Sequence, residues 1–97
     1  MILGRIIGTV VCTQKDPRLS GHSLQVVEPI SMATQKSDGK PLVAIDTVGA
    51  GLGEVVLVVT GSSARQTEST TGTPVDAVIM GIVDCIDLDG QRVFEKG

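Results

Sequence analysis

Few residues of this chain have the types and spacing that chemistry requires. Asp46-Thr47-Val48 is similar to half of an aspartic-protease site, but such a site pairs two aspartates on D-T-G or D-S-G turns, and Val48 replaces the glycine. His22 is the only histidine, and no nearby residue supplies the base and orienting group that a nucleophile needs. One histidine and the distant Cys12 and Cys85 give no zinc-ligand spacing. The sequence therefore predicts no catalytic residue and no metal ligand.

The glycine-rich stretch Gly49-Ala50-Gly51-Leu52-Gly53-Glu54 invites comparison with a dinucleotide-binding loop. That loop needs G-x-G-x-x-G after a strand and at the start of a helix, so that the helix N-terminus meets the pyrophosphate. Here Glu54 replaces the last glycine and strand-forming residues follow, so a bend between two strands is the better interpretation. Asp46 is then a hydrogen-bonded or ion-paired carboxylate that closes the adjoining loop, and no cofactor is expected.

Gly61-Ser62-Ser63-Ala64-Arg65 is the most specific polar cluster in the sequence. Two hydroxyls, a guanidinium and the free N–H groups of a short helical turn over 62–68 could together bind a small anion. A capped turn, in which Arg65 pairs with a carboxylate of the same or a neighbouring subunit, accounts for the same residues and is favoured. The alternative function is a free-standing oligomeric protein that binds a small anionic molecule at this cluster.

The composition limits the partners that the protein can have. The 97 residues make one domain, over 1–97, and eight basic against eleven acidic residues give a net charge of −3. Nucleic-acid binding needs a basic footprint and often aromatic stacking, whereas Phe94 is the only aromatic residue here. Neither a nucleic acid nor a membrane is therefore an expected partner.

The compartment expected from the sequence is the cytoplasm. The longest apolar run, Val55–Val59, is too short to cross a bilayer, and no secretory signal pattern precedes the first strand. Cys12 and Cys85 lie in apolar, strand-like segments, where cysteine behaves as a small hydrophobic residue, although a single disulfide is left open.

The apolar pattern has a period of two or is continuous, which is typical of strands. Gly4 and Gly8 indicate a close backbone approach or a bend, and Asp89-Gly90 predicts a two-residue hairpin. Five or six short strands with glycine-marked corners predict an all-β fold, a small closed or nearly closed barrel of the kind that OB-folds exemplify, with one helical turn and a C-terminal hairpin. A sandwich is the alternative. The strands are expected over 2–13, 23–27, 42–48, 54–60, 77–88 and 91–95.

Three ordered segments make the chain similar to a known family. They are Met1-x-Leu3-Gly4-Arg5-x-x-Gly8-x-Val10 with Thr13-Gln14-Lys15, Ala44 to Glu54 running on to Gly61-Ser62-Ser63-Ala64-Arg65, and Pro74-Val75-Asp76 with Gly81-Ile82-Val83-Asp84. Together they resemble the pentameric vertex proteins of bacterial microcompartments, the EutN/CcmL family. The chain looks more like the ethanolamine-utilisation type than the carboxysome type, because of Gly51-Leu52-Gly53-Glu54, the full Gly-Ser-Ser-Ala-Arg and the closing strand over 90–94.

The resemblance implies a non-enzymatic shell protein with a five-stranded OB-like barrel. Five copies would form a cyclic pentamer at the fivefold vertices of a cytoplasmic microcompartment shell, a metabolosome related to the carboxysome. The implied partners are hexameric and trimeric shell proteins, and exposed residues of the loop over 15–21 and the turn over 31–40 are expected at the edge that faces the hexamer.

The resemblance also suggests residue roles, for each of which capping within one chain is an equal alternative. Glu54 and Arg65 are candidates for an ion pair at or beside the subunit interface. The interface hypothesis comprises Asp46, Gly49, Ala50, Gly51, Gly53, Glu54, Arg65, Asp76 and Asp84, and the pore-lining hypothesis comprises Ser62, Ser63 and Ala64.

Overall fold

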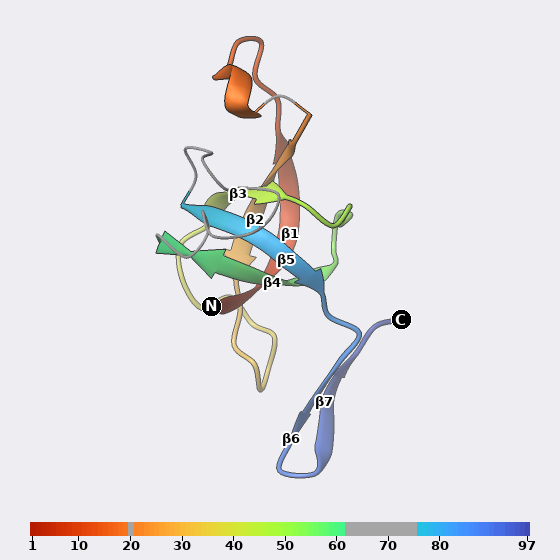
Figure 1. Cartoon of the computed structure of the whole chain (residues 1–97). Helices are drawn as coiled ribbons and strands as arrows, with labels where there is room; N and C mark the ends of the chain where they lie inside the picture. The colour runs from red at the N-terminus through yellow and green to blue at the C-terminus, as the bar shows by residue number, and fades with distance from the viewer. Residues whose placement is uncertain (20, 62–75) are drawn as a thin grey trace.

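The structure is a computed structural model, and it describes residues 1–19, 21–61 and 76–97 (Figure 1). Most of the described chain forms strands, and the helical part is the short 3-10 turn η1 (Pro17–Leu19). The strands are β1 (Ile2–Val10), β2 (Ser23–Pro29), β3 (Leu42–Asp46), β4 (Val55–Thr60), β5 (Ala77–Ile82), β6 (Cys85–Leu88) and β7 (Gln91–Glu95).

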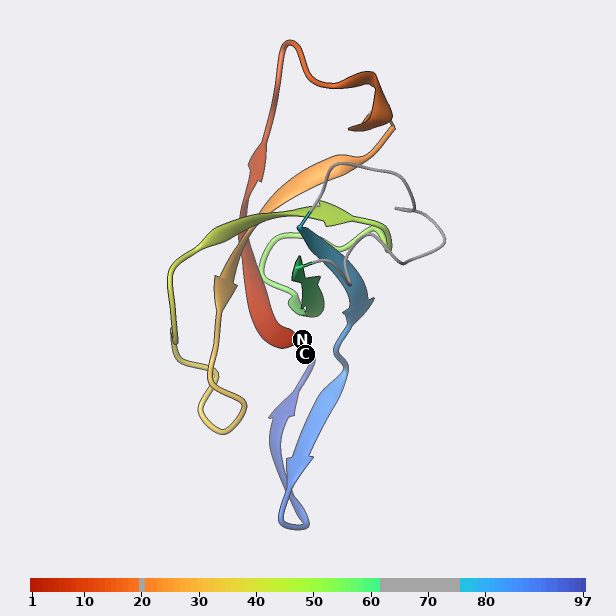
Figure 2. The ribbon, with the colours of Figure 1, turned by 60° about the vertical axis from the view of Figure 1, so that its left-hand side comes forward.

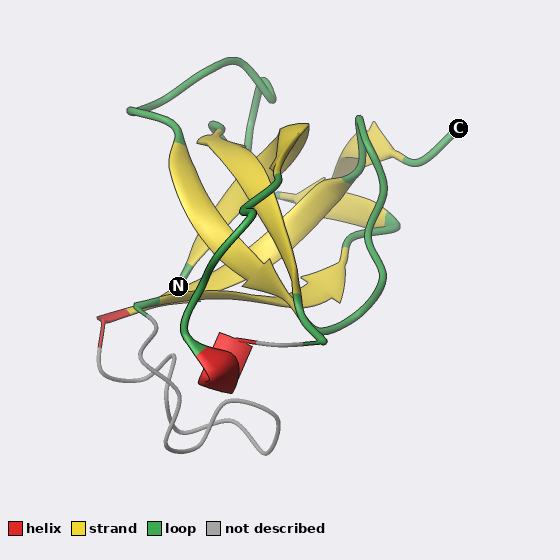
Figure 3. Ribbon diagram, turned by 90° about the horizontal axis from the view of Figure 1, so that it is seen from above, coloured by secondary structure: helices red, strands yellow, loops and turns green. Residues whose placement is uncertain are grey.

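Five of these strands close into a barrel in the order β1-β2-β3-β5-β4. Figure 3 shows the strands of the barrel from above. Neighbouring strands are antiparallel except β3 and β5, which pair in parallel. The predicted five-stranded barrel is therefore confirmed, and the sandwich alternative is wrong. The helical turn predicted over 62–68 lies outside the described residues. No helix in the described parts of the chain is long and apolar enough to span a membrane.

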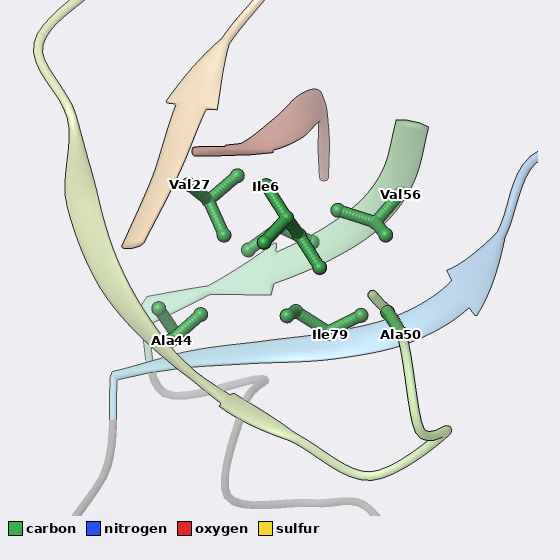
Figure 4. Packing of buried hydrophobic residues seen from close by; sticks show 8 residues of the cluster. Ile6, Val27, Ala44, Ala50, Val56 and Ile79 are labelled. Atoms are coloured by element: carbon green, nitrogen blue, oxygen red, sulfur yellow. The ribbon is translucent and has the colours of Figure 1, made fainter. Parts of the chain in front are cut away.

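The barrel interior is filled by aliphatic side chains from each of the five barrel strands (Figure 4). Alternate residues of a strand point to opposite faces, so Val56 and Val58 of β4 enter the core while Leu57 and Val59 face outward and are half-buried. Close packing of β-branched residues stabilises a core that has no aromatic ring. The main cluster consists of Ile6, Val27, Ala44, Ala50, Val56, Val58, Ala77 and Ile79.

Two glycines of β1 allow the strand to pass close to β2. A Cβ atom on Gly4 would collide with Val27 Cγ1 and lie 3.2 Å from the Glu28 carbonyl oxygen. Near Gly8 the pairing with β2 shifts by one residue, because Ile6 pairs with Val27 and Gly8 with Val26. Such a bulge bends the strand. Both the close approach and the bend predicted for this strand are confirmed.

The predicted single strand over 77–88 is wrong, because the chain leaves the barrel between β5 and β6. After Ile82, the Val83 N–H donates to the Val55 carbonyl oxygen at 2.8 Å, and β6 then pairs with β7. Asp89 and Gly90 both have positive φ, of 50° and 77°, as a two-residue turn of type I′ requires. The predicted Asp-Gly hairpin is confirmed, and it extends away from the barrel (Figure 2).

The two cysteines do not behave as the sequence predicts. β1 ends at Val10 and not at residue 13, so Cys12 lies beyond the strand and is exposed. Cys85 begins β6 and is also exposed. Both thiols are free. Neither cysteine is therefore a small hydrophobic residue of the core.

Candidate functional site

The glycine-rich loop between β3 and β4 is closed at its start by Asp46. The Oδ1 atom of this carboxylate accepts hydrogen bonds from the Val48 and Gly49 N–H groups, both at 2.9 Å. An aspartate side chain commonly caps its own backbone in this way at a turn. Gly49 has a φ of 75°, which favours glycine at that position. The expected role of Asp46 in closing the adjoining loop is confirmed.

A buried amide braces the middle of the loop. Gln25 Nε2 donates to the Ala50 carbonyl oxygen at 3.2 Å and to Asp46 Oδ2 at 3.4 Å. Its Oε1 atom accepts a hydrogen bond from Thr9 Oγ1 at 2.9 Å. Ala50 itself is buried in the core cluster. Because a buried amide must be hydrogen-bonded, Gln25 fixes the loop backbone against β1 and β2.

Glu54 closes the far end of the loop. Its Oε1 atom accepts a hydrogen bond from the Gly51 N–H at 2.6 Å, and its Oε2 atom pairs with Lys96 Nζ at 2.6 Å. The Gly53 N–H donates to the Ile6 carbonyl oxygen at 2.8 Å, which attaches the loop to β1. The Lys96 ammonium and then the Gly51 N–H lower the pKa of Glu54 below its ordinary 4.5, because both favour the charged carboxylate.

The remaining predicted interface residues lie elsewhere. Asp76 and Asp84 are exposed at the two ends of β5, and their backbone carbonyls accept hydrogen bonds from the N–H groups of Gly61 and Lys96, each at 2.8 Å. The structure brings together the loop residues Asp46, Gly49, Ala50, Gly51, Gly53 and Glu54. Ser62, Ser63, Ala64 and Arg65 lie outside the described residues, so the Glu54–Arg65 pair remains a prediction.

Sequence reasoning did not single out Gln25 and Lys96. Gln25 lies two residues before the buried Val27 on the same strand, so the period of two would have placed it on the inward face. Lys96 is 42 residues from Glu54 in the sequence, and no local pattern connects them.

The glycine-rich loop over residues 47–54, called the braced loop below, presents a surface without an exposed reactive group. The carboxylates of Asp46 and Glu54 accept hydrogen bonds from the loop backbone, and Glu54 also pairs with Lys96. Leu52, at the tip of the loop, is 78% exposed. Within the described ranges, no cluster of three or more His, Cys, Asp or Glu side chains could hold a metal ion. A rigid loop with an exposed apolar side chain is suited to contact with another protein.

Replacing Lys96 by alanine is expected to raise the pKa of Glu54, while the Gly51 N–H still holds it below the ordinary value. Since the pKa of Glu54 is lower in the folded state, its contacts stabilise the fold at pH values above 4.5, and this stabilisation is lost as the pH falls through the lowered pKa. A carbon NMR titration of the Glu54 carboxyl group measures the shift. Lys40→Ala is the control, and equal midpoints in the two variants would contradict the ion pair.

Replacing Asp46 by alanine is expected to cost about 1–2 kcal/mol of unfolding free energy, because two loop N–H groups and the Gln25 amide lose an acceptor. Asp46→Asn keeps an oxygen at the Oδ1 position, so it should cost less. Urea unfolding measures both variants, and hydrogen exchange of the Val48 and Gly49 amides should rise in the alanine variant alone. Unchanged exchange in Asp46→Ala would refute the capping role.

Comparison with known proteins shows the class to which this small barrel belongs. The profile of the family described as "Ethanolamine utilisation protein EutN/carboxysome" matches residues 1–84. The shell vertex protein GrpN of Rhodospirillum rubrum is 48% identical over 89 residues, which cover 90% of this chain and 97% of GrpN. The shell vertex protein EutN of Salmonella typhimurium is 45% identical over 96 residues, 99% of this chain and 96% of EutN.

Solved structures give the same result. CcmL of Gloeobacter violaceus matches with a TM-score of 0.91 at 41% identity, covering 99% of this chain and 98% of CcmL. The pentameric GrpN structure matches with a TM-score of 0.81 at 48% identity, covering 91% of this chain and 99% of GrpN.

The chain belongs to the EutN/CcmL family of microcompartment shell proteins. It is a structural shell protein and not an enzyme, as the resemblance implied. The alternative of a free-standing anion-binding protein at residues 61–65 is not favoured, because the relatives are named as shell vertex proteins.

Proposed function

We infer that five copies of this chain, each a single vertex domain over residues 1–97, close into a ring that caps the fivefold vertices of a bacterial microcompartment. The observation that carries this inference is the match to GrpN, described as a pentameric shell protein, over 91% of this chain at 48% identity. Sixfold tiles alone form a flat sheet, so a closed shell needs units of lower symmetry at its corners. A cyclic pentamer supplies that symmetry.

The braced loop is the proposed contact between neighbouring subunits. Asp46, Gln25 and Glu54 each hydrogen-bond its backbone at a different residue. Little conformational entropy is therefore lost when another protein binds it. Val48 and Leu52 would supply the apolar contact, since they are 39% and 78% exposed. The proposed interface also includes Asp76, Asp84 and Arg65, and Ser62, Ser63 and Ala64 are proposed to line the opening on the ring axis.

The ring is proposed to fit among hexameric and trimeric shell proteins. The loop that carries η1 is one candidate surface for these partners, and it is ordered by Asp16, whose side chain accepts hydrogen bonds from the Arg18 backbone at 2.9 Å and its guanidinium at 2.9 and 3.0 Å. Residues 31–40 form the other candidate surface.

Co-assembly with a hexameric shell protein tests the proposed function. Electron microscopy should show closed particles when the hexamer and this chain are produced together, and open sheets or tubes with the hexamer alone. Identical assemblies in the two samples would refute the vertex role.

A further inference from the structure

The C-terminal hairpin has one apolar and one charged face. Ile86 pairs directly with Phe94, and Leu88 follows Ile86 by two residues, so the three side chains share a face. The pairing shifts by one residue after Phe94, so that Asp87, which follows Ile86 on β6, pairs with Arg92, and this pair lies on the opposite face. Arg92 Nε lies 2.9 Å from Asp87 Oδ1, and its guanidinium lies 3.4 Å from Glu95. A hairpin with this division is built to lie with one face against a protein surface and the other in water.

The barrel of the same chain does not supply that surface. β6 and β7 pair with each other in a separate two-stranded sheet, which points away from the barrel (Figures 1 and 2). The apolar side chains of the hairpin are half-buried, and among the described residues they stand outside the core cluster. A two-stranded hairpin is marginally stable in water by itself, so its apolar face needs cover.

Phe94 contributes the largest side chain to the apolar face that needs cover. It is the only aromatic residue in the chain, and it lies on the hairpin and not in the barrel core. An aromatic side chain offers more apolar area than any aliphatic one and frequently dominates the binding energy of an interface.

The base of the hairpin is held in a fixed position. The Lys96 N–H donates to the Asp84 carbonyl oxygen at 2.8 Å, and its ammonium pairs with Glu54 at the end of the braced loop. The hairpin therefore continues from the loop proposed as the subunit contact, and it is directed outward before any partner binds.

We propose that hairpin β6–β7 is an assembly arm, whose apolar face, anchored by Phe94, packs on a neighbouring copy of this chain. The inference rests on the proposed ring, in which each copy has a neighbour beside its braced loop. Because the arm is fixed to that loop by Glu54 and Lys96, the adjacent subunit is the occupant that its position favours.

A fluorescent variant tests the arm directly. The chain contains no tryptophan or tyrosine, so Phe94→Trp introduces a single indole on the apolar face. Its emission is expected to shift to the blue at the concentrations where native mass spectrometry shows rings, and to return to the red on dilution into subunits. Glu95→Trp places the indole on the charged face, and its emission should stay red in both states. Equal emission of Phe94→Trp in rings and in free subunits would overturn the proposal.

Truncation of the same side chain gives an independent measurement. Phe94→Ala is expected to raise the concentration at which half of the rings dissociate by about 10-fold or more, as loss of an interface anchor does. The urea midpoint of free subunits at a fixed low concentration should stay close to that of the parent, since Phe94 lies outside the barrel core. Rings that form as readily as those of the parent would overturn the arm.

The two proposals fail in different ways. If the parent chain forms no ring, the vertex function fails, and the arm fails with it. If rings form and the Phe94 variants behave like the parent, only the arm fails. Emission that shifts to the blue only when a hexameric shell protein is added would assign the hairpin to that protein and overturn the proposed contact between copies.

Discussion

Replacing Ile79 by alanine is expected to lower the free energy of unfolding by about 3–5 kcal/mol. Ile79 is fully buried at the centre of the barrel, where it packs in one cluster with Ile6 and Val56 (Figure 4). Removing three carbon atoms there costs both their transfer from water and a cavity. A barrel of this size has a stability of about 5–15 kcal/mol, so the loss is a large share of the total.

Met80 provides the matched control, because it is the next residue on β5 and is 42% exposed. Met80→Ala should cost less than about 1 kcal/mol. Urea unfolding at one fixed protein concentration measures both variants, since assembly also contributes to apparent stability. Similar losses in the two variants would contradict the position of Ile79 in the core.

Adding one methyl group to Gly4 is expected to destabilise the protein by about 1–3 kcal/mol. A Cβ atom at this position would occupy the space of Val27 Cγ1, and it would lie 3.2 Å from the backbone oxygen of Glu28. Val27 is fully buried, so it cannot move away without disturbing the core. β1 and β2 must separate to accommodate the new atom.

Gly8 on the same strand tests whether this effect is specific. A Cβ atom on Gly8 would meet Val26 at 3.8 Å, an ordinary van der Waals contact. Gly8→Ala should therefore leave stability within about 0.5 kcal/mol of the parent. Thermal unfolding measures the stability of both variants. A larger loss of stability for Gly8→Ala than for Gly4→Ala would contradict the close approach of β1 to β2 at Gly4.

The period of the apolar residues explains why the barrel is predictable. Short segments rich in β-branched residues, with a period of two or continuous as over Val55–Val59, are typical of strands and are visible in a single sequence. The Asp89-Gly90 turn is equally local, because both positions need positive φ. Asp46 caps residues two and three positions ahead, so its role could also be predicted.

Interactions between distant segments explain what the sequence did not reveal. Apolar residues extend through Ile82 and Val83 and resume after Asp84, so the pattern does not show that the chain leaves the barrel there. The bond from the Val83 N–H to the Val55 carbonyl oxygen continues the pairing of β5 with the neighbouring β4, and β6 then pairs with β7 and not with a barrel strand. The Glu54–Lys96 pair likewise depends on where the hairpin returns. Only the three-dimensional fold brings these residues together.

Native mass spectrometry of the purified chain across a concentration series measures whether five copies close into a ring. Five chains of 10.0 kDa give a ring of about 50 kDa. We expect a closed species of this mass that dissociates on dilution. A chain that remains a monomer or a dimer at every concentration would contradict this expectation.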